Sequence, residues 1–251
     1  MKTIGSTIIM LALASSLFAD NGKELKLASP DGTHEIVFYQ KQVSPAVNEL
    51  CYRVDYKSQP VVNESRAGLE LDNRIWEMAL GVRNLKQPAC WMDNLEVDSV
   101  TYQLETNLTW QPLYGERSSV RDHYRAGTLC LSKKDNSGYR LNIEVRAYNE
   151  GVAFRYFFPE HPKAIFHKVV GDLTEYALPA GTKAWTEQWA QAFFERLNID
   201  DIKHPVERTL TFELPNGKWA ALADADVDDW CLTKYLVSTD KKNTLTSVMY
   251  S

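Results

Sequence analysis

Hydrophobic and polar residues alternate with a period of two along much of this chain, which predicts β-strands. The clearest example is a hairpin over residues 139–158. Its first strand places four apolar residues at alternate positions: Leu141, Ile143, Val145 and Ala147. The chain turns at Asn149-Glu150-Gly151 and returns through a second alternating run. This pattern is typical of two antiparallel strands with one face in the core.

Further strands are predicted by short runs rich in β-branched and aromatic residues. The clearest of these runs are 35–39, 50–56, 99–104, 208–214 and 219–223. Turn sequences bound them, such as Ser29-Pro30-Asp31-Gly32 and Pro215-Asn216-Gly217-Lys218. The chain is therefore expected to form an all-β, antiparallel fold.

One segment departs from this pattern, because its bulky residues recur every four positions. They are Trp185, Trp189, Phe193 and Leu197. The spacing fits either an amphipathic helix or an aromatic loop that wraps the sheets, and the sequence does not decide between them.

The first 19 residues have the features of a secretory signal peptide. A short basic start at Lys2 precedes a largely apolar stretch, and Leu17-Phe18-Ala19 is typical of a cleavage site. No later stretch approaches the roughly 20 apolar residues that a membrane span requires. We therefore expect residues 1–19 to be removed and residues 20–251 to be exported.

Residues 20–251 contain no linker, repeat or low-complexity stretch, which indicates one domain. That length is large for an immunoglobulin-type sandwich of about 100 residues and favours two extended sheets with many strands. A β-prone run over residues 244–250 stops at Ser251. Since a domain normally ends with its last strand paired, we expect the chain to be truncated or to belong beside another part.

The composition limits the kinds of molecule that this chain is expected to bind. Lys and Arg number 28 against 33 Asp and Glu, a net charge of -5, so no broad basic face is available for nucleic acid. Aromatic residues make up 11% of the chain. They suit sheet packing as well as flat surfaces on which sugar rings stack.

The common catalytic and metal-binding motifs are absent. The sequence has no GxSxG, HExxH, GxxxxGK[ST] or GxGxxG after a strand. Four cysteines, Cys51, Cys90, Cys130 and Cys231, contain no CxxC pair, so a zinc site is not expected and no disulfide pairing is predicted. Trp110, Tyr114 and Glu116 could face a sugar, although burial against a sheet is favoured for the two rings.

Several segments, in this order, resemble the N-terminal domain of glycoside hydrolase family 97. They include Ser29 to Gly32, Leu50 to Tyr56 and Trp110 to Glu116. The strongest similarity is the hairpin run Arg-Ala-Tyr-Asn-Glu-Gly-Val-Ala-Phe-Arg-Tyr at residues 146–156, where Glu150 replaces an Asp of the family. The resemblance covers essentially the whole mature chain.

The resemblance implies a large antiparallel two-sheet supersandwich of the galactose-mutarotase type. Complete members continue into a catalytic (β/α)₈ barrel and a small C-terminal β-domain, neither of which is present in residues 20–251. These members are calcium-dependent exo-α-glycosidases, including α-glucosidases and α-galactosidases, and mostly periplasmic. Their catalytic residues lie on the barrel, so the resemblance implies no catalytic residue in this chain.

One metal ligand is implied by the resemblance. A Glu in a Tyr-Glu pair of the family's N-terminal domain reaches the active-site Ca²⁺, and Phe194-Glu195 occupies that place here. Calcium prefers six to eight oxygen ligands, whereas one carboxylate supplies two at most. Glu195 would therefore share the calcium with ligands from the catalytic barrel.

Two functions follow. The first is the N-terminal domain of an exported family-97 exo-α-glycosidase, inactive alone, which meets its oligosaccharide substrate through the parent enzyme. An exposed apolar face over residues 185–200, with Glu195 at its edge, would favour this function. The alternative is a free-standing carbohydrate-binding or mutarotase-like β-sandwich, which would need a His acid and a Glu base in one closed cleft.

Overall fold

The structure is a computed structural model that describes most of the chain. The described residues are 23–45, 47–72, 74–81, 91–133, 137–161, 166–225, 227–228 and 230–250. The expected signal peptide at residues 1–19 and Cys90 lie outside these ranges. Cys51, Cys130 and Cys231 are free thiols.

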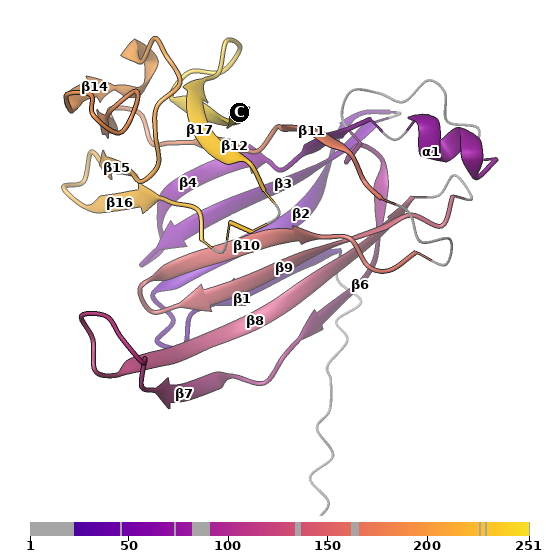
Figure 1. Cartoon of the computed structure of the whole chain (residues 1–251), viewed down its shortest axis with the longest axis horizontal. Coiled ribbons are helices and arrows are strands. Elements are labelled where there is room, and N and C mark those ends of the chain that lie inside the picture. The colour runs from indigo at the N-terminus through magenta and orange to yellow at the C-terminus, as the bar shows by residue number, and fades with distance from the viewer. Residues whose placement is uncertain are drawn as a thin grey trace, which may run out of the picture.

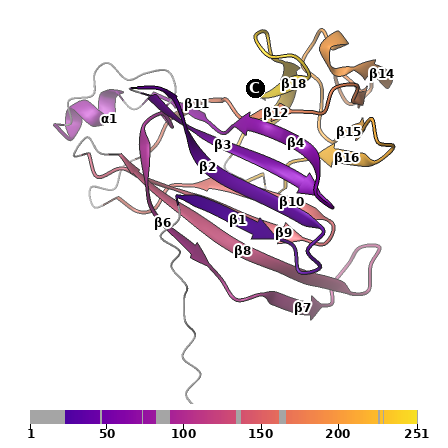
Figure 2. The same cartoon turned by 180° about the vertical axis from the view of Figure 1, so that it is seen from behind.

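Two large antiparallel sheets form the body of the molecule. The first has the order β1-β2-β3-β4 and contains β1 (Glu24–Ala28), β2 (His34–Ser44), β3 (Val47–Tyr56) and β4 (Gln59–Arg66). The second has the order β10-β9-β8-β6, with β7 paired to β8. Its strands are β6 (Leu95–Tyr102), β7 (Thr106–Trp110), β8 (Val120–Lys133), β9 (Arg140–Tyr148) and β10 (Gly151–Phe157). Figures 1 and 2 show these sheets from opposite sides of the molecule.

The hairpin predicted from the alternating pattern is confirmed as β9 and β10. Gly151 pairs with Tyr148 and Phe154 pairs with Val145, so the turn lies at residues 149–150. The four apolar residues at alternate positions of β9 are all buried, whereas the residues between them are partly or fully exposed. The period-two alternation therefore correctly predicted which face of this strand lies in the core.

The core lies between the two large sheets. Phe38 and Tyr52 from the first sheet pack against Phe154 from the second, with ring centroids 5.1 to 5.3 Å apart. Leu129 and Ile143 are fully buried in the same cluster. Burial of these apolar side chains is the main stabilising contribution, at about 25 cal/mol for each Å² removed from water.

Three smaller sheets complete the fold: β12 contacts β4 of the first large sheet, and β18 contacts β11 and the 3₁₀ turn at Ile199–Asp201. One pairs β5 (Leu69–Leu71) with β11 (Val169–Asp172). Another has the order β12-β18-β17, formed by β12 (Glu175–Ala177), β17 (Leu232–Val237) and β18 (Thr244–Tyr250). The last has the order β14-β13-β15-β16, formed by β13 (Lys183–Thr186), β14 (Glu195–Asn198), β15 (Leu210–Glu213) and β16 (Trp219–Leu222).

The all-β antiparallel fold expected from the sequence is thus confirmed, with smaller sheets added to the two large ones. A short helix, α1 (Arg74–Ala79), and a single 3₁₀ turn at Ile199–Asp201 were not predicted. The period-four segment is not a helix: β13 and β14 are antiparallel strands joined by a loop over residues 187–194. The alternative interpretation, an aromatic loop, is correct only for residues 187–194.

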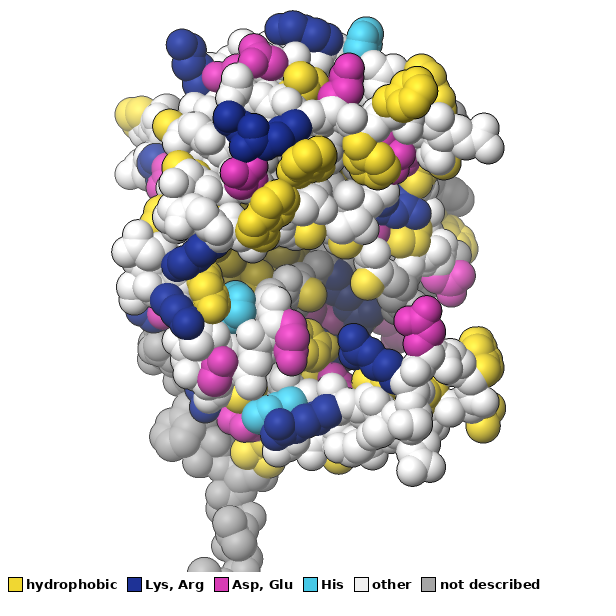
Figure 3. Space-filling model, turned by 90° about the vertical axis from the view of Figure 1, so that its left-hand side faces the viewer, with side chains coloured by type: hydrophobic (Ala, Val, Ile, Leu, Met, Phe, Trp, Pro, Cys, Tyr) yellow, Lys and Arg dark blue, Asp and Glu magenta, His cyan; other side chains and the backbone are white. Residues whose placement is uncertain are grey.

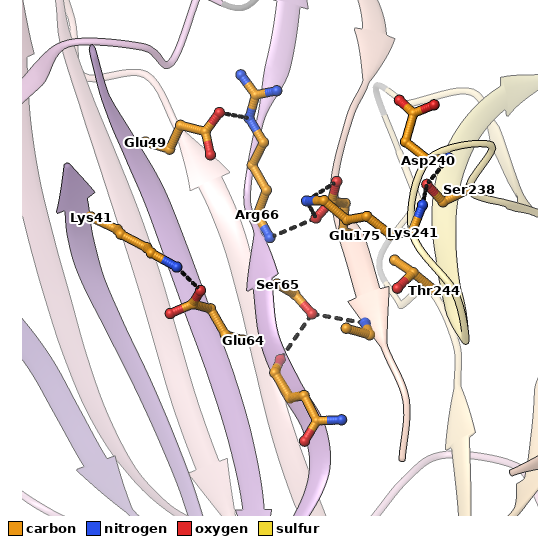
Figure 4. Close-up of polar contacts among 12 residues, drawn as sticks. Lys41, Glu49, Glu64, Ser65, Arg66, Glu175, Ser238, Asp240, Lys241 and Thr244 are labelled. Carbon is orange, nitrogen blue, oxygen red and sulfur yellow. Dashed lines mark hydrogen bonds and ion pairs between the residues drawn. The ribbon is translucent and has the colours of Figure 1, made fainter. Parts of the chain in front are cut away.

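Polar contacts attach β12 to the sandwich, as Figure 4 shows. The Glu175 carboxylate accepts hydrogen bonds from the Arg66 backbone N–H at 3.2 Å and from Lys241 Nζ at 2.7 Å. Ser65 Oγ accepts a hydrogen bond from the Ala177 backbone N–H at 2.8 Å. Strand β18 pairs on both sides, with β12 and with β17. The expected truncation after Ser251 stays a prediction.

Candidate functional site

Glu195 lies at the first position of β14, at the end of the aromatic loop. It is opposite Thr186 of β13, whose Oγ1 donates a hydrogen bond to the Glu195 backbone carbonyl at 3.2 Å. Its side chain is exposed and takes part in none of the ion pairs that join described residues. The Glu195 carboxylate is therefore available to a ligand or partner outside the chain.

A cavity of about 560 Å³ adjoins Glu195. It is lined by the loop over residues 187–194, by β14 and by the segment 201–206. Three carboxylates are among its lining groups: Glu187, Glu195 and Asp201. Lys203 and His204 also line it. The cavity therefore combines acidic and basic groups with apolar side chains.

These residues alone do not make a calcium site. Calcium prefers six to eight oxygen ligands, and the Glu195 carboxylate offers two at most. Within the described part of the chain, no group of three or more His, Cys, Asp or Glu residues lies close enough to hold a metal ion. A calcium ion bound at Glu195 would need most of its ligands from elsewhere.

The buried side chain of Lys234 anchors the start of the loop beside Glu195. Lys234 Nζ on β17 donates a hydrogen bond to the Gln188 carbonyl at 2.8 Å and pairs with the Glu207 carboxylate at 2.8 Å. The Glu207 backbone N–H in turn donates to the Glu187 carbonyl at 2.9 Å. Because the Lys234 side chain is only 8% exposed, this contact fixes the start of the loop to the sheet beneath it.

The outer surface of the same loop is strongly apolar and unburied. Phe193 is 94% exposed and Trp189 is 58% exposed, and Phe194 beside Glu195 is also exposed. Figure 3 shows large hydrophobic side chains gathered in the upper part of this side of the molecule, where β14, β15 and β16 lie in Figure 1. Soluble monomers rarely expose clustered aromatic residues unless these form an interaction site.

The β7–β8 hairpin adds further exposed rings on the same side of the molecule in Figure 1. Trp110 and Glu116 are exposed, and Tyr114 at the hairpin tip is 89% exposed. The preference for buried sheet packing of the two rings was therefore wrong. Strand β7 pairs only with β8 and stands off the main sheet path, so nothing covers its rings within the described residues.

A second cavity, of about 590 Å³, lies among the edge strands β4, β10 and β16. His34 and Glu150 both line it, and a hollow is visible on this side of the molecule in Figure 3. Burial lowers the pKa of His34, while the negative charges of Asp31 and Glu150 raise it by smaller amounts. The cleft is open to the surface rather than closed.

The sequence analysis proposed Glu195 but none of the other groups at these sites. Lys234, Glu207 and Gln188 are distant in sequence, and no local pattern marks their contact. His34 and Glu150 were not singled out either, because β2 and the β9–β10 turn meet only in the folded sandwich. The hairpin turn that contains Glu150 was recognisable, but not the histidine opposite it.

Comparisons with known proteins place this fold. The sequence model described as glycosyl-hydrolase 97 N-terminal matches residues 27–251. A retaining α-galactosidase of Bacteroides thetaiotaomicron is 23% identical over 259 residues, an alignment that covers 96% of this chain and 34% of that relative.

Solved structures give the same result for the fold. A family 97 enzyme of Pseudoalteromonas sp. strain K8 in complex with acarbose superposes with a TM-score of 0.75 at 22% identity, over 90% of this chain and 32% of that one. A variant of that enzyme in complex with panose matches equally well. A β-arabinopyranosidase has a TM-score of 0.72 at 16% identity and covers 90% of this chain and 35% of its own.

This chain spans about a third of the length of these relatives. None of the helices in the described ranges is long and apolar enough to cross a membrane. With the family match extending from β1 to the last residue, the chain belongs to the N-terminal domains of glycoside hydrolase family 97.

Proposed function

We propose that this chain is the N-terminal domain of an exported, calcium-dependent exo-α-glycosidase. In this proposal it packs against a catalytic barrel and supplies Glu195 as one ligand of the active-site calcium. The observation that carries the proposal is the exposed aromatic loop over residues 187–194, with the unpaired Glu195 carboxylate at its end. Such a surface would lose its unfavourable contact with water once a partner domain covered it.

The length of the relatives supports a partner domain in the same polypeptide. About two thirds of each relative lies outside the part that aligns with this chain. Two structures of one of those relatives are described as complexes with acarbose and with panose, which supports an oligosaccharide as the substrate class. Export is supported by the sequence of residues 1–19, which lie outside the described ranges.

Calcium titration by isothermal calorimetry tests the shared metal site. The isolated chain should bind Ca²⁺ weakly or not at all, because Glu195 alone cannot satisfy the coordination that calcium prefers. Sub-micromolar affinity of the isolated chain would contradict the proposal. The isolated chain should also fail to hydrolyse aryl α-glucosides and aryl α-galactosides.

The gene provides an independent test. An open reading frame that continues beyond codon 251 into a (β/α)₈ barrel would support the proposal, and a stop codon with no barrel nearby would count against it. In the joined protein, Glu195→Gln should reduce hydrolysis and calcium affinity together, whereas Glu187→Gln, at a carboxylate of the same cavity, should leave both nearly unchanged.

The presence of His34 and Glu150 in one cavity supports a second candidate function, although this cavity is open and not closed. A free-standing mutarotase-like domain would use a histidine as general acid at the sugar ring oxygen and a glutamate as general base at the anomeric hydroxyl. NMR measurement of the interconversion of α- and β-glucose distinguishes this function. Acceleration that disappears in both His34→Ala and Glu150→Gln would favour it, and a rate equal to that of buffer would exclude it.

A further inference from the structure

We propose that the outer face of the β14-β13-β15-β16 sheet is an oligosaccharide-binding platform built on Trp185 and Trp219. The choice of an oligosaccharide as the ligand rests on the proposed function. The platform is distinct from the cavity beside Glu195, which neither tryptophan lines, whereas Trp219 also lines the cavity of about 590 Å³.

Alternation in the four strands separates an inner face from an outer one. Ala184, Leu210 and Phe212 point into the core and are at most 1% exposed. Their neighbours along each strand point outward, and the burial patterns of β13, β15 and β16 agree with this alternation. In β14, the register places Arg196 and Asn198 on the outer face, opposite Trp185 and Lys183. Trp219 is 58% exposed and Trp185 is 38% exposed. Both rings therefore lie on the outer face.

The strand register fixes how far apart the two rings lie. Trp185 is opposite Arg196 on one side and Thr211 on the other, while Trp219 is opposite Glu213. The two tryptophans are thus two strands apart and two residues apart along the strands. With strands about 4.8 Å apart and a rise of about 3.4 Å per residue, their backbones lie roughly 12 Å apart. An oligosaccharide spans this distance, whereas a single pyranose ring does not.

Polar groups occupy the surface between the rings. Arg196 Nε donates a hydrogen bond to Glu213 Oε2 at 2.8 Å, and Lys183 is opposite Glu213 on the same face. Thr211 adds a hydroxyl beside Trp185. A sugar presents C–H groups to the faces of aromatic rings and hydroxyls that donate and accept hydrogen bonds. The platform offers partners for both.

The same charges disfavour an apolar protein surface as the occupant. Burying the Arg196–Glu213 pair under apolar groups would remove both charges from water without new partners, which is costly. A glycan would instead replace lost water contacts with hydroxyl groups. The aromatic loop over residues 187–194 differs, because its exposed rings are not interleaved with such a pair.

Titration of the full chain with panose by isothermal calorimetry tests the platform, and saturation-transfer NMR identifies the sugar protons in contact. Panose should bind more tightly than glucose, which cannot reach both rings. Trp185→Ala and Trp219→Ala should each weaken panose binding about tenfold, the equivalent of about 1.4 kcal/mol for loss of a stacked ring. Trp219→Phe should retain much of the affinity, because it keeps an aromatic face.

Trp189→Ala is the matched control, since Trp189 is also 58% exposed but belongs to the aromatic loop. It should leave panose affinity unchanged. Absence of panose binding, or binding unaffected by both Trp185→Ala and Trp219→Ala, would overturn the platform. Loss of binding in Trp189→Ala alone would indicate that panose binds at the Glu195 cavity, and this result would also overturn the platform. These outcomes leave the calcium and reading-frame tests of the proposed function untouched.

Discussion

Removal of the Lys234 ammonium group should destabilise the sheet beneath the aromatic loop. The Lys234→Met variant keeps most of the apolar stem but leaves the Glu207 carboxylate without its cation and the Gln188 carbonyl without its donor. It also removes a cation that lies 4.3 Å from the Tyr250 ring centroid. Since the two side chains are 8% and 15% exposed, breaking this pair should cost about 3 to 5 kcal/mol.

Urea denaturation followed by circular dichroism measures this loss, which corresponds to a decrease in Tm of about 10 °C for a domain of this size. The double variant Lys234→Met/Glu207→Gln should recover part of the stability, because it removes the uncompensated charge. Lys26→Met provides a control at an exposed ion pair with Glu35 and should cost less than about 1 kcal/mol. A loss from Lys234→Met no larger than that of the control would refute the reasoning.

Three further changes test the packing and the electrostatics. Leu129→Ala, in the core, should cost about 2 to 5 kcal/mol in urea denaturation, whereas Leu108→Ala, at an exposed position, should stay within about 0.5 kcal/mol; equal losses would contradict the assigned core. Gly127→Ala should cost about 1 to 3 kcal/mol, because the new Cβ would lie 3.1 Å from Leu25 Cδ1; unchanged stability would show that the neighbours relax. Burial lowers the pKa of His167 from 6.5 to about 4, so the folded state binds fewer protons in this range and its contribution to stability falls as pH decreases from 6.5 towards 4. His167→Phe should flatten that part of the stability profile, and an unchanged slope would exclude His167 as its source.

The sequence predicted those strands and turns whose signals lie close together along the chain. The β9–β10 hairpin combines alternating apolar residues with a turn sequence, and both signals lie within 20 residues of the chain. The period-four spacing of Trp185, Trp189, Phe193 and Leu197 failed as a guide because two of these residues belong to strands and two to the loop between them. Spacing alone does not reveal where a strand ends.

The candidate site was harder to predict, because its groups come from separate sheets. Glu195 was found only through the family resemblance, and nothing in its own neighbourhood identifies it as a metal ligand. The contact between Lys234 and Gln188 joins residues 46 positions apart. Exposure of Tyr114 was also misjudged, since aromatic residues next to a strand are usually buried when another sheet covers them, and here none does.

The central position of β18 has a consequence for how the chain reaches its native state. Residues 244–250 complete a sheet with β12, whose residues 175–177 emerge from the ribosome about 70 residues earlier. Until β18 arrives, one edge of β12 and one edge of β17 lack their backbone partners and present open templates for other chains. Pairing over such long sequence separation is intrinsically slow. Before β18 docks, these unpaired edges therefore expose the chain to aggregation, and a chaperone bound at that stage would protect them.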